Sequence, residues 1–180
     1  MSVKISYSNK TSKNLSGNIV LFVDEKFNNN NLKKYISNSE LLYIKDLLKT
    51  NDLKKNIFIF DVNSKKRIIL ISIKKEIKSS DIENLGAEFY SRTDNRNKNE
   101  YFLIADSLIS KNKNFISHFL HGIKLKSYEF KKYKTKKETK NILIQVLGNK
   151  NKPSIQNQIK FKALEEGSFY ARDLVSEPGN

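Results

Sequence analysis

The sequence predicts an α/β fold, with a mixed β-sheet that has helices on both faces. Apolar residues alternate along the chain between short Ile-, Val- and Phe-rich runs and helical spacing, which is typical of alternating strands and helices. The runs are apolar on both sides, as strands are when helices cover both faces of a sheet. Two of the runs are separated only by residues 63–66, so these two strands are expected to form an antiparallel hairpin.

Five strongly apolar runs are expected to form the main strands. Each run is short, rich in β-branched and aromatic residues, and bounded by Asn, Asp, Ser or Lys. The five predicted strands are 18–24, 56–62, 67–73, 100–105 and 141–147. Residues 3–7 alternate between apolar and polar side chains, and we expect them to form a sixth strand at an edge of the sheet.

Helical spacing appears in three of the segments between these strands. The second of the helices is expected to begin with a capping box formed by Ser80 and Glu83. In each helix the apolar residues fall on one stripe, which is expected to face the sheet. These stripes are Leu41, Ile44 and Leu48; Ile82, Leu85 and Phe89; and Ile116, Phe119, Leu120 and Ile123.

The chain is expected to comprise one α/β domain, residues 1–150, followed in residues 151–180 by a linker helix and the start of a next domain. The polar segments 27–34 and 131–140 are too short to separate domains. From Ser154 onward, helical spacing continues almost to the last residue. No other predicted element is expected to cover the apolar face of this helix. That face comprises Ile159, Ala163, Gly167, Tyr170, Ala171, Leu174 and Val175. We therefore interpret the chain as the front part of a longer protein whose next domain would cover that face.

Composition limits the classes of function. There is no cysteine, which excludes disulfides and thiolate chemistry, and no apolar stretch approaches the ~18 residues of a membrane span. We expect a cytoplasmic protein without a membrane partner. The formal net charge of +15 favours a polyanionic partner. However, the excess is nearly all Lys and accompanies abundant Asn and Ile, a bias that an AT-rich coding sequence also produces.

No catalytic, cofactor-binding or metal-binding residue is predicted in this chain. The two histidines, His118 and His121, are spaced so that they could share a metal ion, but the sequence indicates no third ligand. The six glycines form neither a dinucleotide-binding nor a P-loop motif.

One segment has the composition of a single-stranded nucleic-acid site, because it mixes aromatic rings with cations. The possible polyanion patch comprises Lys131, Lys132, Lys134, Lys136 and Lys137. Its aromatic residues, Tyr128, Phe130 and Tyr133, could equally anchor the chain to the core after the third helix. A basic DNA-binding module is therefore the alternative function.

Two stretches resemble one known family. Residues 122–134 match the pattern G-x-x-L-x-x-Y-x-F-x-x-Y-K, and residues 171–180 read A-R-D-L-V-S-E-P-G-N. The first is similar to a stretch near the end of the N-terminal domain of leucyl (cytosol) aminopeptidases. The second resembles that family's A-R-D-L-V-N-x-P-x-N signature, with Ser176 in place of the common Asn and Gly179 in place of a frequent Pro.

The resemblance implies a non-catalytic N-terminal domain, macro-domain-like in fold, that serves assembly or regulation. The parent enzyme would release N-terminal residues, often leucine, from peptides with two divalent metal ions, Mn or Zn, bound in the catalytic domain that would follow. The parent would be a homohexamer, so the expected partners are that domain and neighbouring subunits.

The junction residues are Arg172, Asp173, Leu174, Pro178 and Asn180. Arg172 and Asp173 are expected to fix the linker helix against the next domain. By analogy with the macro fold alone, nucleotide or ADP-ribose binding is a third hypothesis.

Overall fold

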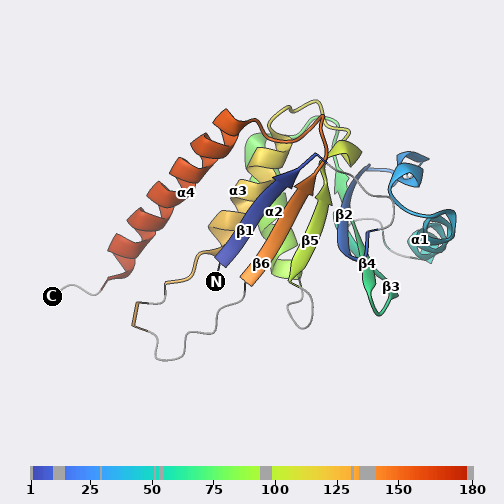
Figure 1. The fold of residues 1–180 in the computed structure, drawn as a ribbon, viewed down its shortest axis with the longest axis horizontal. Coiled ribbons are helices and arrows are strands. Elements are labelled where there is room, and N and C mark those ends of the chain that lie inside the picture. The colour runs from blue at the N-terminus through green and yellow to red at the C-terminus, as the bar shows by residue number, and fades with distance from the viewer. Residues whose placement is uncertain are drawn as a thin grey trace.

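Six strands form one sheet in the order β1-β6-β5-β2-β4-β3 (Figure 1). The computed structural model describes residues 2–9, 15–28, 30–50, 52, 55–93, 99–130, 132–133 and 141–177. The strands are β1 Ser2–Ser8, β2 Gly17–Asp24, β3 Ile57–Asn63, β4 Lys66–Ile73, β5 Glu100–Ile104 and β6 Asn141–Leu147. The helices are α1 Asn38–Thr50, α2 Ser79–Arg92, α3 Phe115–Ser127 and α4 Ile155–Ser176, with short 3-10 helices η1 Asn30–Lys34 and η2 Ala105–Ser107.

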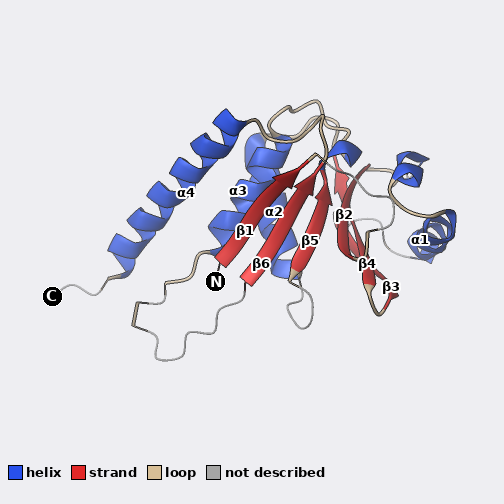
Figure 2. Cartoon of the chain, viewed as in Figure 1, coloured by secondary structure: helices blue, strands red, loops and turns tan. Residues whose placement is uncertain are grey.

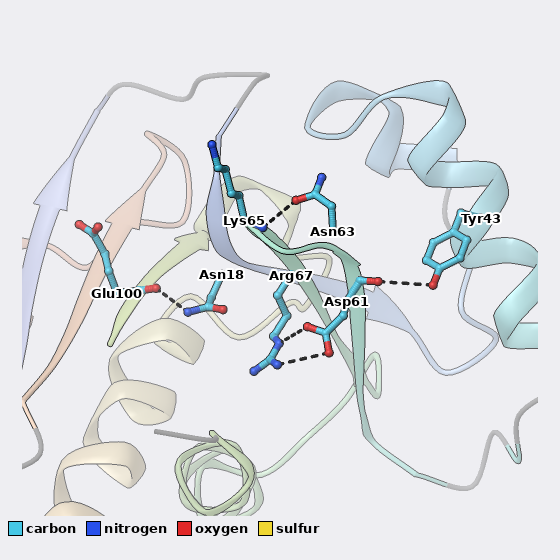
Figure 3. A network of polar contacts seen from close by, with 7 residues as sticks. All are labelled: Asn18, Tyr43, Asp61, Asn63, Lys65, Arg67 and Glu100. Atoms are coloured by element: carbon cyan, nitrogen blue, oxygen red, sulfur yellow. Dashed lines mark hydrogen bonds and ion pairs between the residues drawn. The ribbon is translucent and has the colours of Figure 1, made fainter. Parts of the chain in front are cut away.

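The sheet is mixed because β3 and β4 form the hairpin that the sequence predicts. β3 pairs with β4 in antiparallel orientation, and the other neighbouring strands are parallel. At the hairpin, Arg67 forms an ion pair of 2.6 Å with Asp61, and the Lys65 amide donates a hydrogen bond to Asn63 (Figure 3). β1, the sixth predicted strand, is the edge strand at the opposite end of the sheet.

Each face of the sheet has its own hydrophobic core, because successive residues of a strand point to opposite faces. On the central strand β2, Val20 and Phe22 belong to the core that α2 and α3 cover, whereas Leu21 belongs to the core that α1 and η1 cover. Figure 2 shows these helices on the two sides of the sheet. All ten apolar helix residues expected to face the sheet are buried. The prediction of an α/β fold with helices on both faces is confirmed.

Helices α2 and α3 cross at very short range. A Cβ atom added at Gly122 would lie 1.9 Å from the carbonyl oxygen of Glu83, and one added at Gly86 would lie 2.1 Å from that of Phe119. Each helix therefore contacts the backbone of the other, and only glycine fits at the two crossing positions.

Two local predictions were wrong. The capping box does not form, because α2 begins at Ser79 after Lys78 without a side-chain cap, and the Glu83 carboxylate lies 2.8 Å from His118 of α3 instead. The segment 27–34 is not only a polar loop. It contains η1, and Phe27 and Leu32 are buried against the α1 side of the sheet, so tertiary packing outweighs its polar composition.

Candidate functional site

The two stretches that resemble the family begin in α3 and in α4 and continue past the end of each helix, and the described residues of these segments form the candidate site. α4 begins where Ser154 accepts a hydrogen bond from the Asn157 amide, an ordinary N-cap. It then runs along α3 at the end of the molecule that carries β1 (Figure 1). Among the described residues of α4, only Phe161 is buried. The face of α4 that contacts the domain is therefore narrow.

Phe161 packs between the two histidines of α3. Its ring lies edge-on to His118 and His121, with ring centroids 5.0 and 5.3 Å apart respectively. Each histidine faces a different carboxylate. His118 Nδ1 lies 2.8 Å from Glu83 Oε1 of α2, and His121 Nδ1 lies 3.6 Å from Glu165 Oε1 of α4. The histidines thus serve the packing of three helices in this structure.

The two stretches that resemble the family contact each other. The Tyr128 hydroxyl donates a hydrogen bond of 2.7 Å to Asp173, and the Arg172 guanidinium lies 5.4 Å from the centre of the Tyr128 ring. Arg172 also donates to the Leu125 carbonyl at the end of α3. Burial and the hydrogen bond to Asp173 raise the pKa of the Tyr128 hydroxyl. Arg172 and Asp173 therefore hold α4 on its own domain, and their expected contact with a following domain stays a prediction.

This contact was not predicted from the sequence, although a signal for it existed. Tyr128 and Asp173 lie in the two stretches that match the same family. The contact face of α4, with Phe161, Glu165 and Phe169, also has helical spacing. The predicted stripe lies on the opposite face of the helix.

The structure describes little of the possible polyanion patch. Lys131, Lys134, Lys136 and Lys137 lie outside the described residues, as do the junction residues Pro178 and Asn180. Lys132 forms an ion pair with Glu177 at the end of α4, and this hydrogen bond and charge raise the pKa of the lysine. The Tyr128 ring packs on Phe169 of α4 with centroids 5.4 Å apart. Lys132 and Tyr128 thus act as contacts to α4.

The other face of α4 presents the predicted apolar stripe to solvent. Along this face, four large side chains are exposed by 57% or more. We call Ile155, Ile159, Tyr170 and Leu174 the outer stripe. Ile155 is not in the predicted set, whereas Val175 is, and Val175 is 87% exposed. A run of large apolar side chains on one helix face is a feature of interaction surfaces.

At the carboxyl edge of the sheet, where α/β sheets usually bind nucleotides, the ends of β5 and β6 are covered by the chain itself, whereas the ends of β2 and β4 line a pocket with Asp24, Lys26 and Ile73. Ser107 of η2 accepts a hydrogen bond of 2.9 Å from the Phe22 amide of β2 and donates one to Ile104. The adjacent Asp106 carboxylate accepts hydrogen bonds from the backbone amides of 149–151. Successive backbone amides of this kind bind anions in other proteins, and here their ligand is an internal carboxylate. The arrangement at β5 and β6 gives no support to nucleotide binding there.

Among the described residues, no three His, Asp or Glu side chains are grouped closely enough to hold a metal ion. The metal pair that the resemblance implies is expected in the catalytic domain that would follow, and not among these residues. No helix in the described part of the chain is both long and apolar enough to cross a bilayer.

Comparison with known proteins identifies the family. Residues 19–137 match the model of the cytosol aminopeptidase family, N-terminal domain. No curated protein matches the sequence. Two solved structures of aminopeptidases have a similar fold. A mutant of tomato leucine aminopeptidase is similar over 98% of this chain and 39% of its own, at 17% identity and a TM-score of 0.73. The cytosol aminopeptidase of Coxiella burnetii is similar over 96% of this chain and 33% of its own, at 11% identity and a TM-score of 0.60.

A third similar structure, the bottromycin maturation enzyme BotP in complex with Mn, covers 91% of this chain and 32% of its own, at 9% identity and a TM-score of 0.62. This chain thus spans about two fifths or less of the length of each of these structures. The family model covers well over half of the chain, and the chain therefore belongs to the cytosol aminopeptidase family, as an N-terminal domain.

Proposed function

We propose that this chain is the non-catalytic N-terminal domain of a cytosolic metalloaminopeptidase and that it serves assembly or regulation of the enzyme. The observation that carries the proposal is the arrangement of α4 within a domain of this family. One face of α4 is held on the domain by Phe161 and Arg172, and the outer stripe on the opposite face is uncovered.

The occupant proposed for the outer stripe is the catalytic domain that would follow. The similar aminopeptidase structures are more than twice as long as this chain, which leaves room for such a domain. In the parent enzyme, two divalent ions in that domain, Mn or Zn, would polarise the scissile carbonyl and activate water. Its substrates would be peptides, and the proposed assembly is a homohexamer.

The test is an extended protein that includes the residues encoded after Asn180. We expect it to release leucine from a leucine arylamide only with a divalent metal present, whereas the 180-residue chain releases none. A correctly folded extended protein that lacks metal-dependent hydrolysis contradicts the proposal.

A matched pair of variants tests the role of α4 in the extended protein. Leu174→Gln places an amide in the outer stripe and is expected to weaken association of the two domains, seen as a lower midpoint of thermal unfolding. Lys160→Gln, at another exposed position of α4, is the control and should behave as the wild type. Equal midpoints for both variants would exclude the outer stripe as the interface.

The DNA-binding alternative has no support beyond the net charge. The one lysine of the patch that the structure describes pairs with Glu177, and the family match concerns an aminopeptidase domain.

A further inference from the structure

A pocket lies between β1, α3 and α4, on the side of α4 that faces the domain. Its volume is about 240 Å³, and Tyr7, Lys124, Phe161, Lys162 and Glu165 are among the residues that line it. Pockets for drug-sized ligands begin at about 300 Å³, so this one suits a smaller molecule.

The pocket contains a carboxylate whose polar contacts are incomplete. The Glu165 side chain is only 13% exposed, and among the described residues no hydrogen bond reaches it. His121 Nδ1, a buried atom without a hydrogen bond, lies 3.6 Å from Glu165 Oε1, within ion-pair distance. Burial and the negative charge of Glu165 raise the pKa of Tyr7, also in the pocket wall, to about 12. Glu165 is partly buried, and its carboxylate can accept a charge-assisted hydrogen bond from a cationic group that enters the pocket.

Two cations line the same pocket, and they make a purely cationic ligand unfavourable. Lys124 forms no ion pair with any described residue, and the only such partner of Lys162 is Glu166, at 3.8 Å. The rest of the wall is mixed, with apolar Ile5, Leu120, Pro153 and Phe161 beside polar Ser117, Asn157 and Gln158. The pocket thus combines one anionic group, two cationic groups and an aliphatic and aromatic surface.

We propose that this pocket binds a small aliphatic α-amino acid in its zwitterionic form. The ammonium of the ligand would pair with Glu165, its carboxylate with Lys124 or Lys162, and its side chain would lie on Leu120 and Phe161. The proposal goes beyond the function proposed above, because binding to this chain requires no catalytic domain. In an aminopeptidase, the ligand would belong to the same chemical class as the product.

The first test is an NMR titration of the 180-residue chain with L-leucine. We expect saturable shifts of the backbone amides that surround the pocket at ligand concentrations up to about 10 mM. Leucinamide lacks the carboxylate, 4-methylpentanoate lacks the ammonium, and glycine lacks the aliphatic side chain, and each should bind about tenfold more weakly or worse. The absence of saturable shifts with L-leucine, or equal binding of leucinamide, overturns the proposal.

A pair of variants that each remove one carboxylate gives a second, independent test. Glu165→Gln keeps the size of the side chain but removes its charge, and it should lower the affinity for L-leucine by about tenfold or more. Glu76→Gln is the control, because the Glu76 side chain is 83% exposed and does not line the pocket. Unchanged affinity in Glu165→Gln, with the spectrum of a folded protein, would refute the assigned ammonium site. The proposed aminopeptidase function would be unaffected by that result.

Discussion

At the residue scale, Asp106 holds the turn that leads from β6 into α4. Its Oδ1 accepts hydrogen bonds from the amides of Asn149 and Lys150, at 3.1 and 2.8 Å. Gly148 precedes this turn with a φ of +137°, and a Cβ atom there would lie 2.7 Å from Asp106 Oδ1. The close approach of carboxylate and backbone therefore depends on a glycine at that position.

We expect Asp106→Asn to lower the free energy of unfolding by about 1 to 3 kcal/mol, because a neutral amide accepts these backbone hydrogen bonds less well than a carboxylate. Urea denaturation of the chain measures the change. Asp46→Asn is the control, since the Asp46 side chain is 75% exposed, and its effect should stay within about 0.5 kcal/mol. Equal effects of the two substitutions would show that the turn does not depend on the carboxylate.

Tyr7 provides a prediction about pH. Its pKa is raised from 10.0 to about 12, by burial and by the charge of Glu165, so between these values the unfolded chain loses this proton while the folded chain keeps it. The unfolded state then binds fewer protons, and the free energy of unfolding falls as pH rises through this window. Below pH 10 this contribution to stability is fully present.

The measurement is the difference in unfolding free energy between pH 9 and pH 11, about one unit on either side of the ordinary tyrosine pKa. Tyr7→Phe should show a smaller loss than the wild type, because phenylalanine has no proton to lose. Tyr170→Phe, at a position that is 67% exposed, should follow the wild type. If Tyr7→Phe has the same pH dependence as the wild type, Tyr7 is not the group responsible.

At the scale of the elements, the crossing of α2 and α3 depends on two glycines. Gly122→Ala should lower the free energy of unfolding by about 2 to 4 kcal/mol, because the new methyl group would overlap the Glu83 carbonyl and force the helices apart. Gly167→Ala in α4 is the matched control, since no atom lies within 4 Å of its added Cβ. It should stabilise the chain by about 0.5 to 1 kcal/mol through helix propensity. Thermal unfolding of both variants is the measurement, and a neutral Gly122→Ala would show that the helices can separate at little cost.

At the scale of the whole molecule, the outer stripe of α4 is expected to affect association more than stability. The double substitution Tyr170→Ser and Leu174→Gln should change the free energy of unfolding of the 180-residue chain by about 0.5 kcal/mol or less, because both side chains are more than half exposed. It should also reduce any self-association of the chain at high concentration, as measured by light scattering. A large loss of stability would mean that the stripe packs against the domain.

Most of the fold could be predicted from local patterns. The strands, the β3–β4 hairpin and the buried stripes of α1, α2 and α3 follow from the period of the apolar residues, because that period differs between strands and helices. The error at Glu83 has a physical reason. A capping box is a local hydrogen-bond pattern, and a histidine from another helix competes for the same carboxylate.

The sequence by itself determined the fold class, the family and the presence of a long amphipathic helix at the end of the chain. Only the tertiary structure decided which face of that helix contacts the domain, because the choice depends on Phe161, Arg172 and Asp173 meeting partners on α3 and just beyond it. The tertiary structure also brought Glu165 and Lys124 to one pocket, although they are far apart in the sequence. The physical reason is that periodicity encodes burial along one element, whereas contacts between elements depend on how the whole sheet and its helices pack.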